Sequence, residues 1–198
     1  GNGADPRNNL YWGAMYGTKT FLRRSKAWDE VRTINITNGT VLQRIILKHR
    51  VTGAYLVADA YRGVKIKEAI EAFFHAAAGN MPVVLKVDGG LIGTYGKADM
   101  IAYVGHNGLM DFQVTPAQKR NTALPAPAAI VLACYSKRYF RDTLAKYGCK
   151  PMLLTNGRMA PEAYTLEAAI EAWLAGRGSQ GMRGQAAMAY NKYQKCGI

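Results

Sequence analysis

MIAYVGHNG over residues 100–108 and AAIVLACYS over residues 128–136 are the two stretches that decide the fold of this chain. Each is a short apolar run followed by small residues, a pattern typical of a buried strand. His106 lies just past the first run and Cys134 just past the second. In open α/β sheets, ligands bind outside the carboxyl ends of the strands. We therefore expect both side chains at one edge of a sheet, as a thiol nucleophile and its base.

Each of the two residues also has an ordinary structural interpretation. A histidine between glycines at a strand end can be a turn residue whose ring only needs a hydrogen-bond partner. A cysteine after an apolar run is often a small buried hydrophobic side chain. The joint placement favours chemistry, because the 28 positions from His106 to Cys134 (134 minus 106) fit one loop and one short crossover.

Strand-like and helical patterns alternate along the rest of the chain. We expect further strands over 10–17, 41–47, 54–58, 81–87 and 151–155. We expect helices over 18–32, 66–78, 138–146 and 161–175, and a short helix after 176. This alternation predicts an α/β three-layer sandwich with a mostly parallel central sheet flanked by helices. Residues 10–198 are expected to form a single domain, after a flexible polar lead at 1–9.

The charge of the chain suggests an acidic partner. The 198 residues carry 26 Lys and Arg against 13 Asp and Glu, a net charge of +13. The basic residues are scattered, which predicts a solvated basic surface that attracts an acidic protein partner or inhibitor and does not favour nucleic acid. No apolar run approaches the ~18 residues that span a bilayer, so no membrane insertion is expected. The localisation is open: secreted or periplasmic if a signal peptide has been removed, otherwise cytoplasmic.

Cysteine and histidine usage predicts no metal or cofactor. The three cysteines are odd in number and form no CxxC pair, which argues against a disulfide framework and a structural zinc site. A single bridge between Cys149 and Cys196 stays open. The three histidines are too dispersed for a metal site, and neither a GxSxG nor a Walker-type GxxxxGK[ST] motif is present.

The two strand-end blocks resemble those of the clan CD cysteine peptidases, the group of caspases, legumain and gingipains. Members share an α/β sandwich, the caspase–hemoglobinase fold, with one strand ending in His-Gly and a later strand ending in Ala-Cys. IAYVGHNG looks like the first block, and AIVLACYS looks like the second. The resemblance covers roughly residues 10–175. It implies a cysteine endopeptidase that acts on polypeptides without a metal or cofactor.

The resemblance also implies roles for the residues of the two blocks. Cys134 is the nucleophile, and His106 protonates the leaving amine and later activates water. The main-chain N–H of Gly108 or Asn107, together with that of Cys134, would hold the oxyanion.

Substrate contacts are less specified. Ala133 and Tyr135, which flank Cys134, are expected to touch the substrate. Asp59 is the first candidate for an acidic pocket floor that would select Arg or Lys, and Asp111 is the second. Conversely, the basic surface, including Arg62, could select an acidic side chain, and the sequence favours neither preference. The loop over 154–164 either lines the cleft or is an ordinary strand-to-helix turn.

Two other functions remain open. The chain could be a catalytically inactive α/β binding module whose basic surface takes nucleic acid or an acidic protein. It could also be a different α/β enzyme, a thiol hydrolase or acyltransferase that acts on small molecules.

Overall fold

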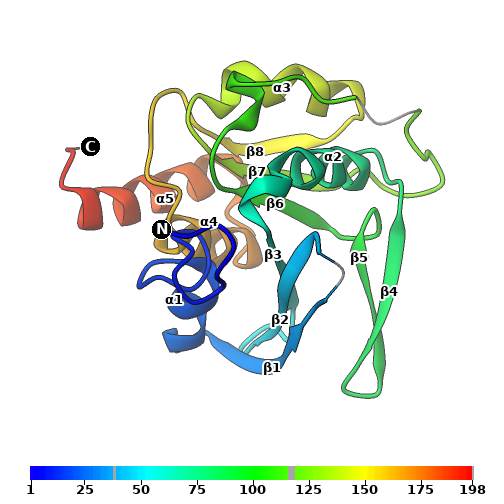
Figure 1. The fold of residues 1–198 in the computed structure, drawn as a ribbon, viewed down its shortest axis with the longest axis horizontal. Coiled ribbons are helices and arrows are strands. Elements are labelled where there is room, and N and C mark those ends of the chain that lie inside the picture. The colour runs from blue at the N-terminus through cyan, green and yellow to red at the C-terminus, as the bar shows by residue number, and fades with distance from the viewer. Residues whose placement is uncertain (38, 116–118, 198) are drawn as a thin grey trace. The chain divides into compact units, whose positions relative to one another are not determined.

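The computed structural model describes residues 1–37, 39–115 and 119–197 of the chain (Figure 1). The chain forms two compact units. Unit 1 comprises residues 1–66 and 162–198, and unit 2 comprises residues 67–161. The organisation of residues 10–198 as a single domain stays a prediction.

Unit 2 is built on a parallel sheet of three strands in the order β6-β7-β8. These strands are β6 (Met100–Val104), β7 (Ala128–Leu132) and β8 (Lys150–Leu154). The middle strand, β7, is buried at four of its five positions, from Ala129 to Leu132. A run of apolar residues without polar alternation is typical of a parallel strand that is covered on both faces.

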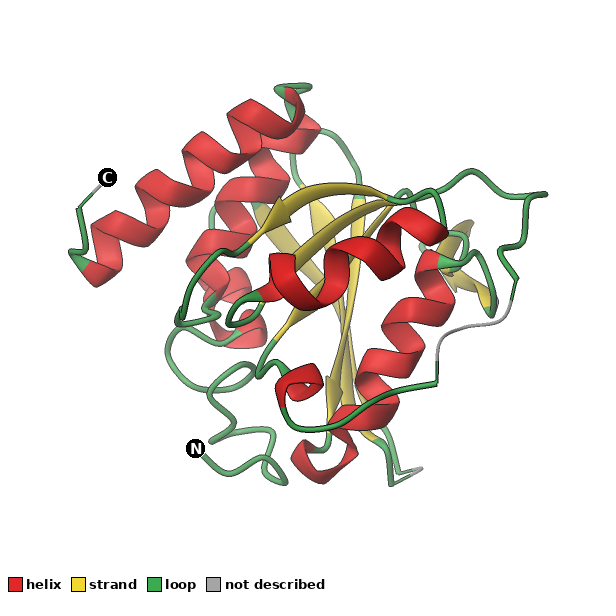
Figure 2. Cartoon of the chain, turned by 90° about the horizontal axis from the view of Figure 1, so that it is seen from above, coloured by secondary structure: helices red, strands yellow, loops and turns green. Residues whose placement is uncertain are grey.

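Two helices of unit 2 pack on this sheet through aromatic side chains. α2 (Ile66–Ala77) supplies Phe73 and Phe74, and α3 (Ser136–Lys146) supplies Phe140. The Phe140 ring stacks on Tyr103 of β6 with the ring centroids 5.8 Å apart, and it lies 6.1 Å from Phe73. Figure 2 shows both helices lying in front of the strands. This cluster fixes α3, whose first residue follows Cys134 by two positions.

A hairpin of β4 (Pro82–Val87) and β5 (Gly90–Tyr95) completes the regular structure described for unit 2, apart from the short helix η2 (Gly108–Met110). The turn at 88–89 has a positive φ at both Asp88 (49°) and Gly89 (78°). Positive φ at both central residues is the geometry of tight hairpin turns. The Gly-rich stretch after residue 88 therefore forms a strand, which the sequence analysis does not predict.

Unit 1 holds an antiparallel sheet of β1 (Trp28–Asn35), β2 (Val41–His49) and β3 (Tyr55–Tyr61) in that order. The central strand β2 is the most buried, with Ile45 and Leu47 fully enclosed. Three helices belong to the same unit: α1 (Thr18–Arg24), α4 (Ala163–Leu174) and α5 (Gly178–Gln194), of which α4 packs against both α1 and α5. A short helix η1 (Gly63–Lys65) follows β3.

The predicted single, mostly parallel central sheet is wrong. The chain is an α/β protein, but in its described residues five strands lie in antiparallel sheets and the parallel sheet has only three. The cause is loop length: residues 50–54 join β2 to β3, and residues 88–89 join β4 to β5. A parallel pair needs a crossover of a dozen or more residues, so connections this short force antiparallel pairing.

The first expected strand is also absent. Residues 10–17 form consecutive turns, in which Gly17 N–H donates to Ala14 O at 2.9 Å. A side chain at Gly17 would lie 2.5 Å from the Trp12 backbone, so only glycine allows this close approach. The helix expected over 18–32 ends at Arg24, and residues 28–32 belong to β1.

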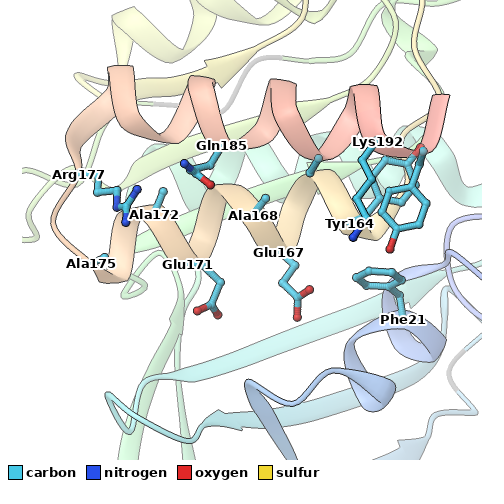
Figure 3. A pocket seen from close by; sticks show the side chains of 12 residues that line it. Phe21, Tyr164, Glu167, Ala168, Glu171, Ala172, Ala175, Arg177, Gln185 and Lys192 are labelled. Carbon is cyan, nitrogen blue, oxygen red and sulfur yellow. The ribbon is translucent and has the colours of Figure 1, made fainter. Parts of the chain in front are cut away.

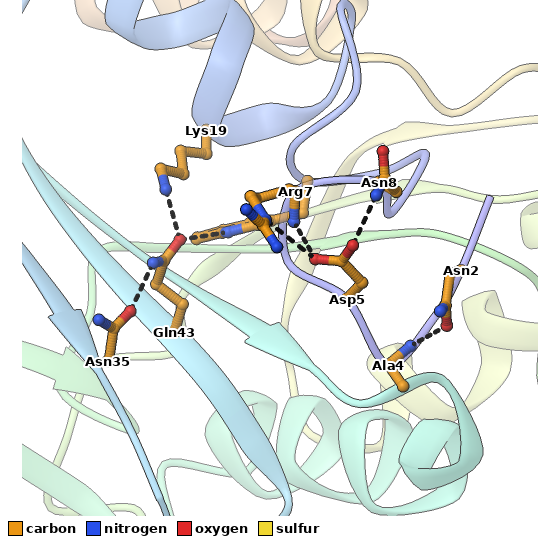
Figure 4. Close-up of polar contacts among 9 residues, drawn as sticks. Asn2, Ala4, Asp5, Arg7, Asn8, Lys19, Asn35 and Gln43 are labelled. Atoms are coloured by element: carbon orange, nitrogen blue, oxygen red, sulfur yellow. Dashed lines mark hydrogen bonds and ion pairs between the residues drawn. The ribbon is translucent and has the colours of Figure 1, made fainter.

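The polar lead is folded into hydrogen-bonded turns. The Asp5 carboxylate accepts from Arg7 N–H at 2.8 Å and from the Asn8 amide at 2.5 Å (Figure 4). Gly63 N–H donates to Gly3 O at 2.8 Å, which ties the lead to the end of β3.

Within the described ranges, no helix combines the length and the apolar character needed to cross a membrane.

Candidate active site at the end of β6 and β7

The parallel pairing of β6 and β7 sets the candidate site. Val104 is in register with Leu132, and Gly105 N–H donates to Leu132 O at 3.1 Å beyond the last pair. His106 and Cys134 each follow two positions after that last register pair, so both leave the sheet at the same edge. The backbone therefore places His106 and Cys134 just beyond the carboxyl ends of two neighbouring parallel strands.

The imidazole of His106 is half-exposed and its Nε2 lies 2.6 Å from Asp111 Oδ2. No hydrogen bond joins His106 to Cys134 among the residues that the structure describes. Asp111 therefore contacts the histidine, whereas the sequence analysis assigns it to the substrate pocket.

Side-chain hydrogen bonds from Tyr103 and Asn107 hold the turn that carries His106. The Tyr103 hydroxyl donates to His106 O at 2.7 Å. Asn107 is fully buried, and its amide spans the two loops: Nδ2 donates to Cys134 O at 2.7 Å, and Oδ1 accepts from Leu109 N–H at 3.1 Å. One buried side chain thus links the histidine turn directly to the cysteine turn.

Two main-chain donors at this edge have no described acceptor. Within residues 1–37, 39–115 and 119–197, neither the Asn107 N–H nor the Cys134 N–H donates a hydrogen bond. Gly108 N–H, in contrast, donates to His106 O at 3.1 Å. Among the described residues, the N–H groups of Asn107 and Cys134 thus remain available to an acceptor, and that of Gly108 does not.

Cys134 is a free, partly buried thiol that touches the loop after β8. Met159 N–H donates to Cys134 Sγ at 3.5 Å, and Sγ lies 3.6 Å from Met159 O. Tyr135 N–H donates to Gly157 O at 2.8 Å in the same loop. The loop over 154–164, which the sequence leaves between a cleft wall and an ordinary turn, is thus in contact with the thiol.

The residues after Cys134 make a sharp strand-to-helix turn. Tyr135 has φ 52° and ψ 30°, the left-handed conformation, and precedes the first residue of α3. Ala133 is fully buried, and its carbonyl accepts a hydrogen bond from the Thr155 hydroxyl. Both predicted substrate contacts therefore also shape the backbone that holds the thiol.

A second hydroxyl completes that support and was missed by sequence reasoning. Ser136 is fully buried; its Oγ lies 2.8 Å from Val131 O and 3.0 Å from Thr155 Oγ1. Ser136 N–H donates to Thr155 Oγ1 at 3.1 Å. Hydroxyl residues just past two neighbouring strands, β7 and β8, are the signal that could have found this pair.

Asp59 belongs to unit 1 and is already engaged. Its two carboxylate oxygens accept from Arg44 Nε at 2.6 Å and from Arg44 Nη2 at 2.8 Å, on the neighbouring strand β2. This bidentate pair is only slightly exposed. A carboxylate held by a guanidinium in this way is not an open acidic pocket floor.

The other cysteines lie outside the candidate site. Cys149 and Cys196 are both free thiols, so the bridge that the sequence leaves open is not formed. Cys149 is buried and its Sγ lies 3.1 Å from Ala77 O, whereas Cys196 is exposed near the end of the chain. Burial raises the pKa of the Cys149 thiol to about 11, which keeps it protonated and unreactive.

A pocket of about 460 Å³ lies within unit 1 and was not predicted (Figure 3). Glu167 and Glu171, one turn apart on α4, line it together with Phe21, Arg177 and residues of α5. It contains none of the predicted site residues. In the described part of the chain, no group of three His, Cys, Asp or Glu side chains is arranged to hold a metal ion.

Comparison with protein-family models, with curated proteins and with solved structures finds no match to this chain. What the site does must therefore be inferred from its own geometry.

Proposed function

We propose that the protein is a cysteine endopeptidase in which Cys134 is the nucleophile and His106 the general acid and base. The observation that carries the proposal is the shared register of β6 and β7, which delivers both residues two positions beyond the same sheet edge. The thiol is partly exposed and the imidazole half-exposed, so a substrate can reach both. A reactive cysteine needs this combination of access and a neighbouring base.

The reaction divides into two steps. In acylation, His106 takes the thiol proton, Cys134 Sγ attacks the peptide carbonyl carbon, and the C–N bond breaks as the imidazolium returns the proton to the leaving amine. A thioester joins Cys134 to the acyl half of the substrate. In deacylation, His106 accepts a proton from water, the hydroxide attacks the thioester, and the carboxylic acid leaves as the thiol is restored.

The oxyanion of each tetrahedral intermediate is assigned to the main-chain N–H groups of Asn107 and Cys134. Both are donors without an acceptor among the described residues. Asn107 is held rigidly because its side chain bonds to both loops. Donors that are fixed before the reaction stabilise developing charge without reorganisation.

The proposal includes a caspase–hemoglobinase type of fold around the parallel sheet of unit 2. What supports it is the three-stranded parallel sheet, in which His106 and Cys134 follow two neighbouring strands. The substrate is a polypeptide. Asp59 and Asp111 both already have partners, so neither of these two candidates offers an open carboxylate for Arg or Lys. The net charge of +13 favours an acidic substrate or inhibitor.

The test uses peptide acyloxymethyl ketones that carry Arg, Lys, Asn or Asp beside the warhead, followed by peptide mapping by mass spectrometry. We expect a single adduct on Cys134 with at least one member of the panel. The adduct should disappear in Cys134→Ala and in His106→Ala, with the fold intact by circular dichroism.

Cys196 supplies the internal control, because it is an exposed thiol with no described imidazole partner. Iodoacetamide should label it, whereas the peptide ketones should not. Absence of a Cys134 adduct from every ketone on folded protein would overturn the proposal in favour of a catalytically inactive binding module with a basic surface.

A further inference from the structure

The turn after His106 folds back so that one carboxylate meets the ring. η2 carries the chain from Gly108 to Met110, and Asp111 N–H closes the turn on Gly108 O at 3.0 Å. This brings Asp111 Oδ2 to 2.6 Å from His106 Nε2, five residues back along the chain. A contact this short between a ring nitrogen and a carboxylate oxygen is a close hydrogen bond, slightly below the usual ~2.7–2.9 Å of charge-assisted N–H···O bonds.

The contact between Asp111 and His106 determines which nitrogen of the imidazole can act as a base. A carboxylate can only accept, so Nε2 must carry the hydrogen. In the neutral ring, Nδ1 is then the basic nitrogen, and it has no described hydrogen-bond partner. We propose that Asp111 is a positioning residue that holds His106 in the Nε2–H form, with Nδ1 free to exchange protons at Cys134; this rests on the proposed function.

The alternative is an exposed ion pair with no role. The two side chains are 52% and 61% exposed, and exposed pairs contribute little to stability. The turn also has supports that do not involve the Asp111 side chain: Phe112 N–H donates to Gly108 O at 2.9 Å, and Tyr103 donates to His106 O. Removal of the carboxylate should therefore leave the fold in place, and any effect on the reaction reports positioning.

The first experiment observes the ring itself. Long-range ¹H–¹⁵N spectra of His106, assigned with His106→Gln, should show only the Nε2–H tautomer in the wild-type protein above the pH at which the ring is charged. Asp111→Ala should populate both tautomers. Identical spectra for the two proteins would overturn the proposal whether or not the protein cleaves peptides.

The second experiment measures turnover of the best peptide from the ketone panel. Asp111→Ala should lower kcat about 10- to 100-fold, the range typical when a histidine at a metal site loses the carboxylate that orients it, with KM nearly unchanged. Asp111→Glu should recover part of the loss. Asp142→Asn is the matched control, because Asp142 is an exposed carboxylate of unit 2 that pairs with Arg141 on α3.

The outcomes separate the two proposals. If the spectra show only the Nε2–H tautomer but no peptide is turned over, Asp111 does position His106 and the proposed peptidase activity is wrong. If turnover depends on Cys134 but is equal in Asp111→Ala and the wild type, the positioning role of Asp111 is wrong and the peptidase proposal stands.

Discussion

Gly108 shows how the absence of one side chain shapes the His106 turn. It is buried, and a Cβ added there would lie 2.4 Å from Phe112 Cζ and 3.1 Å from Ile70 Cδ1. The Phe112 ring thus occupies the space that any other residue at 108 would need. The glycine is a packing requirement, while the donors proposed for the oxyanion are on its neighbours.

We predict that Gly108→Ala lowers the free energy of unfolding by about 1–3 kcal/mol, the usual cost of overpacking a close contact. Urea denaturation followed by circular dichroism measures it. Gly157→Ala is the control, because no atom lies within 4 Å of a Cβ at that position and its φ is not positive. Equal stability of the two variants would contradict this packing account.

At the scale of elements, the turn from β7 into α3 is tied to the end of β8. Ser136 and Thr155 exchange hydrogen bonds through both hydroxyls and through main-chain N–H groups; Thr155 N–H donates to Ser136 Oγ at 2.8 Å. These bonds hold the segment that contains Cys134 between a strand and a helix. The arrangement keeps the thiol at one position relative to the sheet.

Thr155→Val should therefore cost about 1–3 kcal/mol of stability, because it removes the hydroxyl that donates to Ala133 O and accepts from Ser136 N–H. Those two groups then keep only the longer bond between them, in which Ser136 N–H donates to Ala133 O at 3.3 Å. Thr155→Ser keeps the hydroxyl and should lose less. If the proposed function holds, Thr155→Val should also slow alkylation of Cys134 by the peptide ketones more than Thr155→Ser does. Thermal denaturation and ketone labelling rates measure the two effects, and equal behaviour of the variants would count against this role.

Helix α4 carries a carboxyl group whose burial works against stability. Burial raises the pKa of Glu167, and the nearby charge of Glu171 adds to the shift, whereas a hydrogen bond from Ser25 opposes it. The Glu167 Oε1 atom is buried and has no hydrogen-bond partner in the described part of the chain. The ionised form is thus poorly solvated in the folded state.

Glu167→Gln should stabilise the protein at pH 7 and lose that advantage as the pH falls. A carboxyl group whose pKa is higher in the folded state than in the unfolded state favours folding when it is protonated. The wild type regains this stability as the pH falls through the folded pKa, down to the unfolded value of ~4.3. Melting temperatures of both proteins from pH 4 to pH 7 test the sign; a lower value for Glu167→Gln at pH 7 would contradict it.

Across the whole molecule, the three thiols differ in environment. Cys196 of unit 1 is exposed, Cys134 of unit 2 is partly buried, and Cys149 of unit 2 is buried with a pKa of about 11. With a pKa of about 11, only about one Cys149 thiol in a thousand is ionised at pH 8. Burial adds a barrier to access.

We expect N-ethylmaleimide at pH 8 to modify Cys196 first, Cys134 more slowly and Cys149 only after unfolding. Mass spectrometry of timed samples, with and without denaturant, gives the order. Cys149→Ala should leave the number of thiols modified in the native state unchanged. If Cys149 of the native protein were labelled as fast as Cys196, the predicted order would be wrong.

Sequence reasoning reached the local features that depend on neighbours in the chain. The apolar runs before His106 and Cys134 are strands, the helix expected over 66–78 is α2, and Gly79 follows it with φ 71°. It failed where pairing partners decide. The sequence pattern extends a helix over the first part of β1 and predicts no strand at β5, because each strand is completed by hydrogen bonds to its neighbour, β2 or β4.

In the candidate site, too, some features follow from the local sequence and others from tertiary structure. Apolar periodicity and small residues at strand ends placed His106 and Cys134 at one edge, because parallel strands bring their carboxyl ends together. The partner of each side chain was decided by tertiary structure: Asp111 for the imidazole, Arg44 for Asp59, and the Met159 backbone for the thiol. Periodicity is a property of neighbouring residues, whereas these contacts depend on the three-dimensional path of the turn after β6, the pairing of β2 with β3, and the position of the loop after β8.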